Sequence, residues 1–180
     1  MPLKSSFCYS VALATVATAT LAPVASAATF NFSYTSSTGT ITATVDGTLQ
    51  PDNNTVFVSS ISNTTFNGSP APALPFVGSF DASNLSGSVT GQAVLSLDGS
   101  GLDFIACNTT DCGGADAFAF LPPGLFAAEV FIASPAYGAS FEPFVLANYS
   151  LTPVPEPATV LGLLSVAGVG LLCKRRKLEK

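Results

Sequence analysis

The chain has 180 residues, of which 48% are apolar, and it carries six basic and eleven acidic residues but no histidine. Residues 28–154 contain no Lys or Arg and nine acidic residues, so this stretch has a formal charge of −9. Without cations it cannot neutralise phosphates or clamp a phosphoryl group, which makes nucleic acid, nucleotides and anionic lipid poor partners.

Residues 1–27 have the three parts of a secretory signal peptide. Lys4 supplies a positive charge, residues 11–24 form an uncharged apolar run rich in Ala, and the run closes with Ala25-Ser26-Ala27. Small side chains at Ala25 and Ala27 suit the pockets of signal peptidase, so we predict a cut after Ala27. The alternative, an uncleaved membrane helix, is disfavoured because the apolar run is short.

Residues 28–153 predict one β-rich domain outside the cytoplasm. Hydroxyl and apolar side chains alternate at 40–45, alternation recurs at 88–97, and turn residues follow about every ten positions. We therefore expect an all-β fold, a small antiparallel sandwich or barrel of about eight to ten strands. The candidate strands are residues 29–34, 40–49, 56–66, 76–80, 88–97, 102–107, 117–121, 126–133 and 144–151.

Two segments of this domain need separate treatment. Asp46-Gly47 is compatible with a hairpin turn or with a bulge inside one long strand. Residues 68–75 contain three prolines and predict a long loop, because proline cannot sit inside a sheet.

The chain has fourteen Phe and no Trp, so we expect a core built on phenylalanine. We assign these rings to core packing in preference to ligand stacking. The residues expected to supply most of the buried area are Phe30, Phe32, Phe57, Phe104, Phe118, Phe120, Phe131 and Phe144.

Cys107 and Cys112 are the only cysteines of the middle domain. In an oxidising compartment they are expected to form a disulfide that pins a turn or loop. A zinc site would need further ligands, and the chain has no histidine to provide them. We predict no cofactor.

Four aspartates lie close in sequence around glycine-rich turns: Asp98, Asp103, Asp111 and Asp116. Carboxylate oxygens are ligands for Ca²⁺, so these residues are weak candidates for a calcium site. The EF-hand loop and the glycine-rich calcium-binding repeat are both missing from the sequence, and solvated turn aspartates are the simpler interpretation.

The domain offers little for catalysis. Without histidine or a cation, a Ser-His-Asp triad or a lysine Schiff base is not available. A glycoside hydrolase would need two carboxylates beside a cleft, and Glu129 and Glu142 are the only glutamates of the domain. Nothing in the sequence links them, so we predict that the protein is not an enzyme.

The C-terminal segment, residues 154–180, has three parts in order. Pro155-Glu156-Pro157 comes first, residues 158–173 form an apolar run, and the basic cluster Lys174-Arg175-Arg176-Lys177 opens the end at 174–180. We predict that 158–173 is a transmembrane helix, although it is slightly short, with the basic end in the cytoplasm and the middle domain outside. Cys173 at the helix end is a small apolar filler or an acylation site.

This tripartite tail resembles the PEP-CTERM sorting signal of exported proteins in Gram-negative bacteria and cyanobacteria. In that family an integral-membrane cysteine transpeptidase, the exosortase, is thought to recognise and remove the tail. The two prolines hold Glu156 in an extended conformation, which suits a protease active site. The resemblance covers the last 25 or so residues and says nothing direct about the middle domain.

The sequence thus predicts an exported protein, anchored in the inner membrane at least transiently and then placed at the cell surface or in the extracellular matrix. Signal peptidase and exosortase are its expected processing enzymes, and exopolysaccharide is a possible partner. We expect a non-enzymatic structural or adhesive role. A carbohydrate-binding or Ca²⁺-dependent lectin-like module is the first alternative, and a glycoside hydrolase is the second.

Overall fold

The computed structural model describes residues 26–112, 116–122 and 129–155. Within these residues the chain forms eleven strands in two antiparallel sheets, with one short α-helix and two 3-10 turns. Residues 1–25 of the predicted signal peptide and the predicted transmembrane helix at 158–173 lie outside the described residues. No helix among the described residues has the length and apolar character needed to span a membrane.

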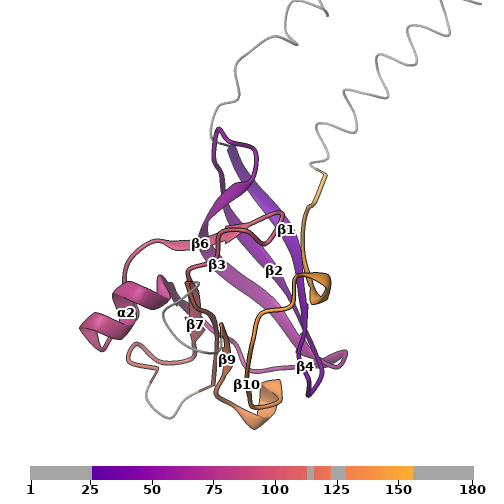
Figure 1. Cartoon of the computed structure of the whole chain (residues 1–180), viewed down its shortest axis with the longest axis vertical. Coiled ribbons are helices and arrows are strands. Elements are labelled where there is room, and N and C mark those ends of the chain that lie inside the picture. Colours follow the sequence, from indigo (N-terminus) through magenta and orange to yellow (C-terminus); the bar gives the residue numbers. More distant parts are fainter. Residues whose placement is uncertain (1–25, 113–115, 123–128, 156–180) are drawn as a thin grey trace, which may run out of the picture. The chain divides into compact units, whose positions relative to one another are not determined.

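The first sheet is built on three long strands (Figure 1): β1 (Ser26–Thr35), β2 (Thr40–Leu49) and β3 (Thr55–Phe66). Its order is β11-β1-β2-β3-β4, and β6 (Ala93–Ser96) also pairs with β3. β11 (Tyr149–Pro153) is thus one edge, and the two-residue β4 (Ser69–Pro70) and β6 lie along the other side of β3. The alternation at 40–45 is confirmed in β2, and the candidate strands 29–34 and 56–66 are confirmed in β1 and β3. One face of each strand is buried.

The second sheet has the order β10-β9-β8-β7-β5 and consists of short strands. Their bounds are Phe76–Gly78 (β5), Phe104–Cys107 (β7), Ala117–Phe120 (β8), Val130–Ile132 (β9) and Ser140–Glu142 (β10). All residues of β7 and β8 are buried, because Phe80, Val89 and Cys112 pack over the outer face of this sheet. The domain is therefore a two-sheet sandwich.

Aromatic rings fill the space between the sheets. Phe32 of the first sheet stacks on Phe118 of the second with ring centroids 5.6 Å apart, and Tyr34 meets Phe120 edge-on at 5.3 Å. The expected burial is confirmed for Phe30, Phe32, Phe104, Phe118 and Phe120.

Phe144 is partly buried against the core, and the predicted burial is wrong for the two remaining phenylalanines. Phe57 and Phe131 point outward and are 39% and 37% exposed. Tyr34, Tyr137 and Tyr149 are buried instead, and each hydroxyl has a backbone partner. Tyr149 donates to the carbonyl of Ser96 at 2.7 Å, and burial raises the pKa of this phenol.

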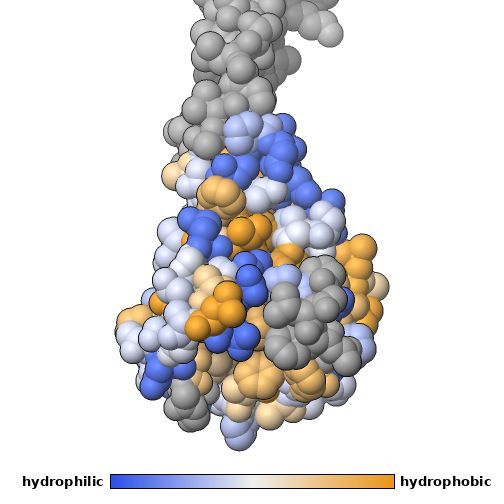
Figure 2. All heavy atoms as spheres, turned by 60° about the vertical axis from the view of Figure 1, so that its left-hand side comes forward, coloured by the Kyte–Doolittle hydropathy of each residue, from blue (hydrophilic) through white to orange (hydrophobic). Residues whose placement is uncertain are grey.

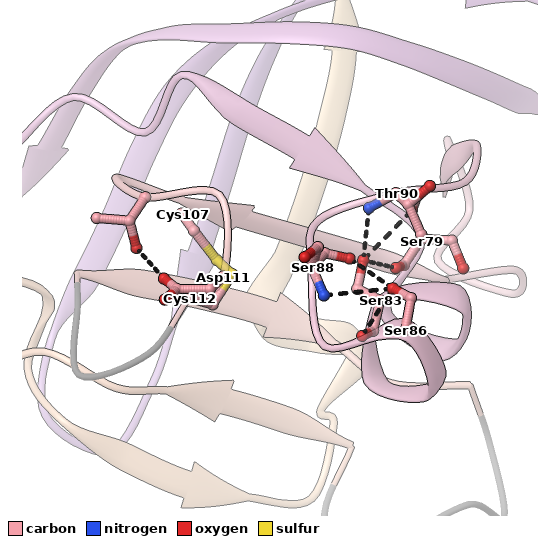
Figure 3. Close-up of a disulfide and its surroundings, with 9 residues drawn as sticks. Ser79, Ser83, Ser86, Ser88, Thr90, Cys107, Asp111 and Cys112 are labelled. Atoms are coloured by element: carbon pink, nitrogen blue, oxygen red, sulfur yellow. Dashed lines mark hydrogen bonds between the residues drawn. A yellow bond between two sulfur atoms is a disulfide. The ribbon is translucent and has the colours of Figure 1, made fainter.

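The short helix α2 (Phe80–Ser86) was not expected from the sequence. The Ser79 hydroxyl caps its N-terminus by accepting from the N–H of Ala82, and Gly87 ends it in the left-handed conformation. Residues 88–92 then close over the helix (Figure 3), with the N–H of Thr90 donating to Ser83 Oγ at 3.0 Å. The predicted strand 88–97 is consequently reduced to β6.

Other strand bounds also differ. The segment 144–151 begins with an irregular stretch and the 3-10 turn Leu146–Asn148 before β11 starts. The proline-rich segment 68–75 contains β4, where Pro70 is tolerated because it lies on an edge strand. Asp46-Gly47 lies inside the continuous strand β2, so the hairpin interpretation is wrong, and the register shift at this point leaves Ser59 of β3 as the extra residue.

Candidate functional site

The first candidate is the place where both ends of the domain leave the first sheet. β1 and β11 are antiparallel neighbours, and Phe30 lies opposite Pro153. The N–H of Val154 donates to the carbonyl of Thr29 at 2.8 Å. The predicted Pro155-Glu156-Pro157 motif therefore starts two residues after the last ladder pair, without an intervening linker. Pro155 is exposed, while Glu156 and Pro157 lie outside the described residues.

The predicted signal cleavage site lies at the start of β1. Ala27 is exposed and pairs with Thr48 of β2, whereas Ala25 lies outside the described residues. A cut after Ala27 would make Ala28, opposite Gly47, the first residue. Such a cut would remove Ser26 and Ala27, the two exposed residues at the start of β1, and would keep Ala28, which packs against the core. The basic cluster Lys174, Arg175, Arg176 and Lys177 lies outside the described residues.

Cys107 and Cys112 form the disulfide expected from the sequence, with their Cα atoms 5.5 Å apart. Cys107 is fully buried at the end of β7, and Cys112 lies in the loop that leads toward β8 (Figure 3). Cys112 has a φ of 51°, a left-handed conformation that few side chains adopt. The bridge therefore fixes a loop in an unusual conformation over the second sheet.

The four aspartates proposed for calcium are held in different places. Asp103 accepts from Ser79 Oγ at 2.5 Å, Asp116 from Asn108 Nδ2 at 3.0 Å, and Asp111 from Thr109 Oγ1 at 2.9 Å. Asp98 accepts from Ser100 and Asn54, and these hydrogen bonds hold the pKa of its carboxyl far below the usual value. Among the described residues no three metal-ligating side chains come together.

Glu129 and Glu142, the two glutamates of the domain, are closer than the sequence suggested. The N–H of Glu129 donates to the backbone carbonyl of Glu142 at 3.2 Å, because β9 and β10 are neighbours. The Glu142 carboxylate accepts from the N–H and the hydroxyl of Ser37 at 3.0 and 2.5 Å. It thus ties β10 to the turn between β1 and β2, which is a structural use of this group.

A shallow hollow lies on the outer face of the first sheet. Its volume is about 360 Å³, and none of its lining residues is ionisable. The lining is Asn31, Phe32, Ser33, Thr42, Ala43, Thr44, Asn63, Ser150 and Thr152. Phe32 and Ala43 are buried and turn toward the core, so the side chains that face the hollow are hydroxyls and amides.

Sequence reasoning did not single out this hollow. The alternation at 40–45 did predict which side chains of β2 face outward, but it did not predict that β11 pairs with β1. That pairing adds Ser150 and Thr152 to the lining.

The rest of the surface mixes polar and apolar patches. Figure 2 shows both kinds side by side on one face of the domain. Large apolar side chains that are exposed among the described residues include Phe57, Phe76, Leu85, Phe131, Phe141, Val145 and Leu146. Phe131 and Phe141 form a ring pair across β9 and β10, with centroids 6.1 Å apart.

Comparison with known proteins identifies a family motif in the tail and finds no match for the β-domain. No curated protein and no solved structure matches the chain. The family model of the PEP-CTERM protein-sorting motif matches residues 153–177, which include the Pro-Glu-Pro sequence, the apolar run and the basic cluster. The chain therefore carries the PEP-CTERM sorting motif that its tail resembles, beginning at the final residue of β11, and this motif implies export and processing by exosortase.

Proposed function

We propose that the protein is a non-enzymatic structural or adhesive component of the cell surface or extracellular matrix. In this proposal the tail holds the chain in the inner membrane until exosortase acts on it. The observation that carries the proposal is the sorting motif at residues 153–177, attached directly to a folded β-domain.

The arrangement of the domain ends supports this topology. An exported chain with an N-terminal signal and a C-terminal anchor meets the same membrane at both ends. In the first sheet the start of β1 and the end of β11 are hydrogen-bonded neighbours, as the Val154 to Thr29 bond shows. Both ends of the domain can therefore face one membrane surface while the sandwich stays folded.

The side chains of the domain support a role without catalysis. From 28 to 154 the chain has no histidine, lysine or arginine to act as base, nucleophile or electrophile. The described carboxylates of Asp98, Asp103 and Glu142 accept hydrogen bonds that hold loops and strand ends. In these contacts the carboxylates stabilise the fold.

The proposal is tested by fractionating cells of a bacterium that has an exosortase and of a matched strain that lacks it. We expect the wild-type protein to leave the inner-membrane fraction only when exosortase is present. The variant Glu156→Gln, which removes the charge of the motif, should remain in the membrane fraction of both strains. Glu129→Gln removes a like charge outside the motif and should behave as wild type. Equal membrane retention of the wild type in both strains would contradict sorting.

A further inference from the structure

The hollow on the outer face of the first sheet is built from two rows of side chains that cross three strands. Thr152, Asn31 and Thr44 form one row, and Ser150, Ser33 and Thr42 form the next, because β11, β1 and β2 pair in that register. Neighbouring strands lie about 4.8 Å apart, so each row presents hydrogen-bonding groups at a short and regular spacing.

A β-bulge in β3 places a further side chain at this hollow. Thr42 lies opposite Thr65 and Thr44 opposite Ser62, so two residues of β3 face one residue of β2 between these pairs. Asn63 occupies the bulge with a φ of 51° and donates from Nδ2 to Thr44 Oγ1 at 3.2 Å. Bulges often redirect a side chain beside a binding site, and this one places an amide at the hollow.

Most of the polar groups at the hollow have no partner within the protein. In the part of the chain that the structure describes, the side chains of Asn31, Ser33, Ser150 and Thr152 make no hydrogen bond. Asn31, Ser150 and Thr152 are also exposed. An amide and three hydroxyls offer both donors and acceptors, which match a ligand whose groups also donate and accept.

The charge of the domain and the side chains that line the hollow restrict the class of ligand that can bind there. An anion would meet no cation, since residues 28–154 have a formal charge of −9. A metal ion would meet no carboxylate among the lining residues. An apolar ligand would bury hydroxyls and amides without replacing their bonds to water. An uncharged ligand rich in hydroxyl groups satisfies all three conditions.

We propose that this hollow binds a short stretch of an uncharged polysaccharide, with Asn31, Asn63, Ser150 and Thr152 as the hydrogen-bonding side chains. The volume of about 360 Å³ lies in the range of small-ligand sites and is enough for part of a glycan chain, not for a folded partner. The inference rests on the proposed function, because a surface or matrix location supplies such a polymer. It identifies the partner class of the adhesive domain.

The experiment measures retardation of the full-length chain, in non-ionic detergent, on native gels cast with a polysaccharide. The probes are the neutral polymers dextran, galactomannan and hydroxyethyl cellulose, with alginate as an anionic contrast. We expect retardation by at least one neutral polymer and none by alginate. The double variant Asn31→Ala, Thr152→Val removes two unpaired groups and should weaken the interaction at least about tenfold.

Two further variants separate binding from folding. Asn63→Gly keeps the left-handed backbone possible but removes the amide, so it should weaken retardation without changing the melting temperature by much. Thr48→Val removes a hydroxyl from the same strand β2 outside the hollow and should behave as wild type.

Three outcomes overturn the proposal: no neutral polymer retards the chain, the double variant binds as wild type, or the variant changes the oligomeric mass instead of polysaccharide binding. The last outcome would make this face an interface between copies. Failure of sorting is a separate result, because the C-terminal processing of all these variants is followed independently by mass spectrometry.

Discussion

Phe30 and Pro153 lie opposite one another on β1 and β11, so the first and last strands of the domain are hydrogen-bonded neighbours. The next contact, from the N–H of Val154 to the carbonyl of Thr29, lies one residue before Pro155 of the sorting motif, inside the matched segment 153–177. The folded domain thus extends up to the motif, and the sheet fixes where the tail begins.

This last contact predicts a difference between two substitutions of Val154. Val154→Pro removes the N–H and should lower the free energy of unfolding by about 1 kcal/mol, because the Thr29 carbonyl loses its partner. Val154→Ala keeps the N–H and should change stability less. Urea unfolding of both variants measures the difference. Equal midpoints would show that the contact contributes nothing.

The disulfide is expected to stabilise the loop that it closes. Replacing Cys107 with Ala and Cys112 with Gly should lower the free energy of unfolding by about 2 kcal/mol, from the entropy of a short closed loop. Glycine at 112 accommodates the φ of 51° there, so the variant tests the bridge and not the backbone conformation. Reductant should lower the melting temperature of the wild type only; an equal decrease in the variant would point to another cause.

From the burial of Tyr149 we expect a loss of stability at alkaline pH. Burial raises the pKa of its phenol above the ordinary value near 10, so its contribution is complete below about pH 10 and is lost as the pH rises toward the folded-state pKa. Tyr149→Phe should flatten this alkaline decline. At neutral pH it should cost about 1 kcal/mol, because the Ser96 carbonyl loses its donor. Melting temperatures between about pH 8 and 11 test both effects, and an unchanged decline would exclude Tyr149 as its source.

For Asp98 we expect the opposite pH dependence, a loss of stability at acid pH. Hydrogen bonds from Ser100 and Asn54 depress the pKa of its carboxyl, so its contribution is present above the unfolded-state pKa near 4 and is lost as the pH falls below it. Asp98→Asn should therefore show a smaller decrease in melting temperature on acidification than the wild type. Asp81→Asn removes a carboxylate whose oxygens accept no hydrogen bond among the described residues, and it serves as the control. Identical acid profiles for the wild type and Asp98→Asn would refute this role.

The long strands and the tail were predictable because their signals are local. β2 (Thr40–Leu49) has the predicted bounds, since every second side chain enters the core. The Pro-Glu-Pro sequence, the apolar run and the basic cluster also follow one another along the chain, so the tail needed no three-dimensional information.

The pairing of the strands, helix α2 and the hollow were less predictable because they depend on distant contacts. In the second sheet, β7 and β8 lie inside the predicted strands 102–107 and 117–121, whereas no strand was predicted for the three-residue β10. Helix α2 depends on the cap at Ser79 and on the closure of residues 88–92 over it, without an amphipathic pattern of its own. The hollow requires the pairing of β1 with β11, and no local pattern gives that pairing.

The central claim is that exosortase acts on the tail that follows the β-domain. Intact mass spectrometry of the protein, isolated from cells with and without exosortase, tests it most directly. We expect the chain from cells with exosortase to lack the basic residues 174–177, and the chain from cells without it to retain them through Lys180. A C-terminus at Lys180 in both samples would contradict the claim.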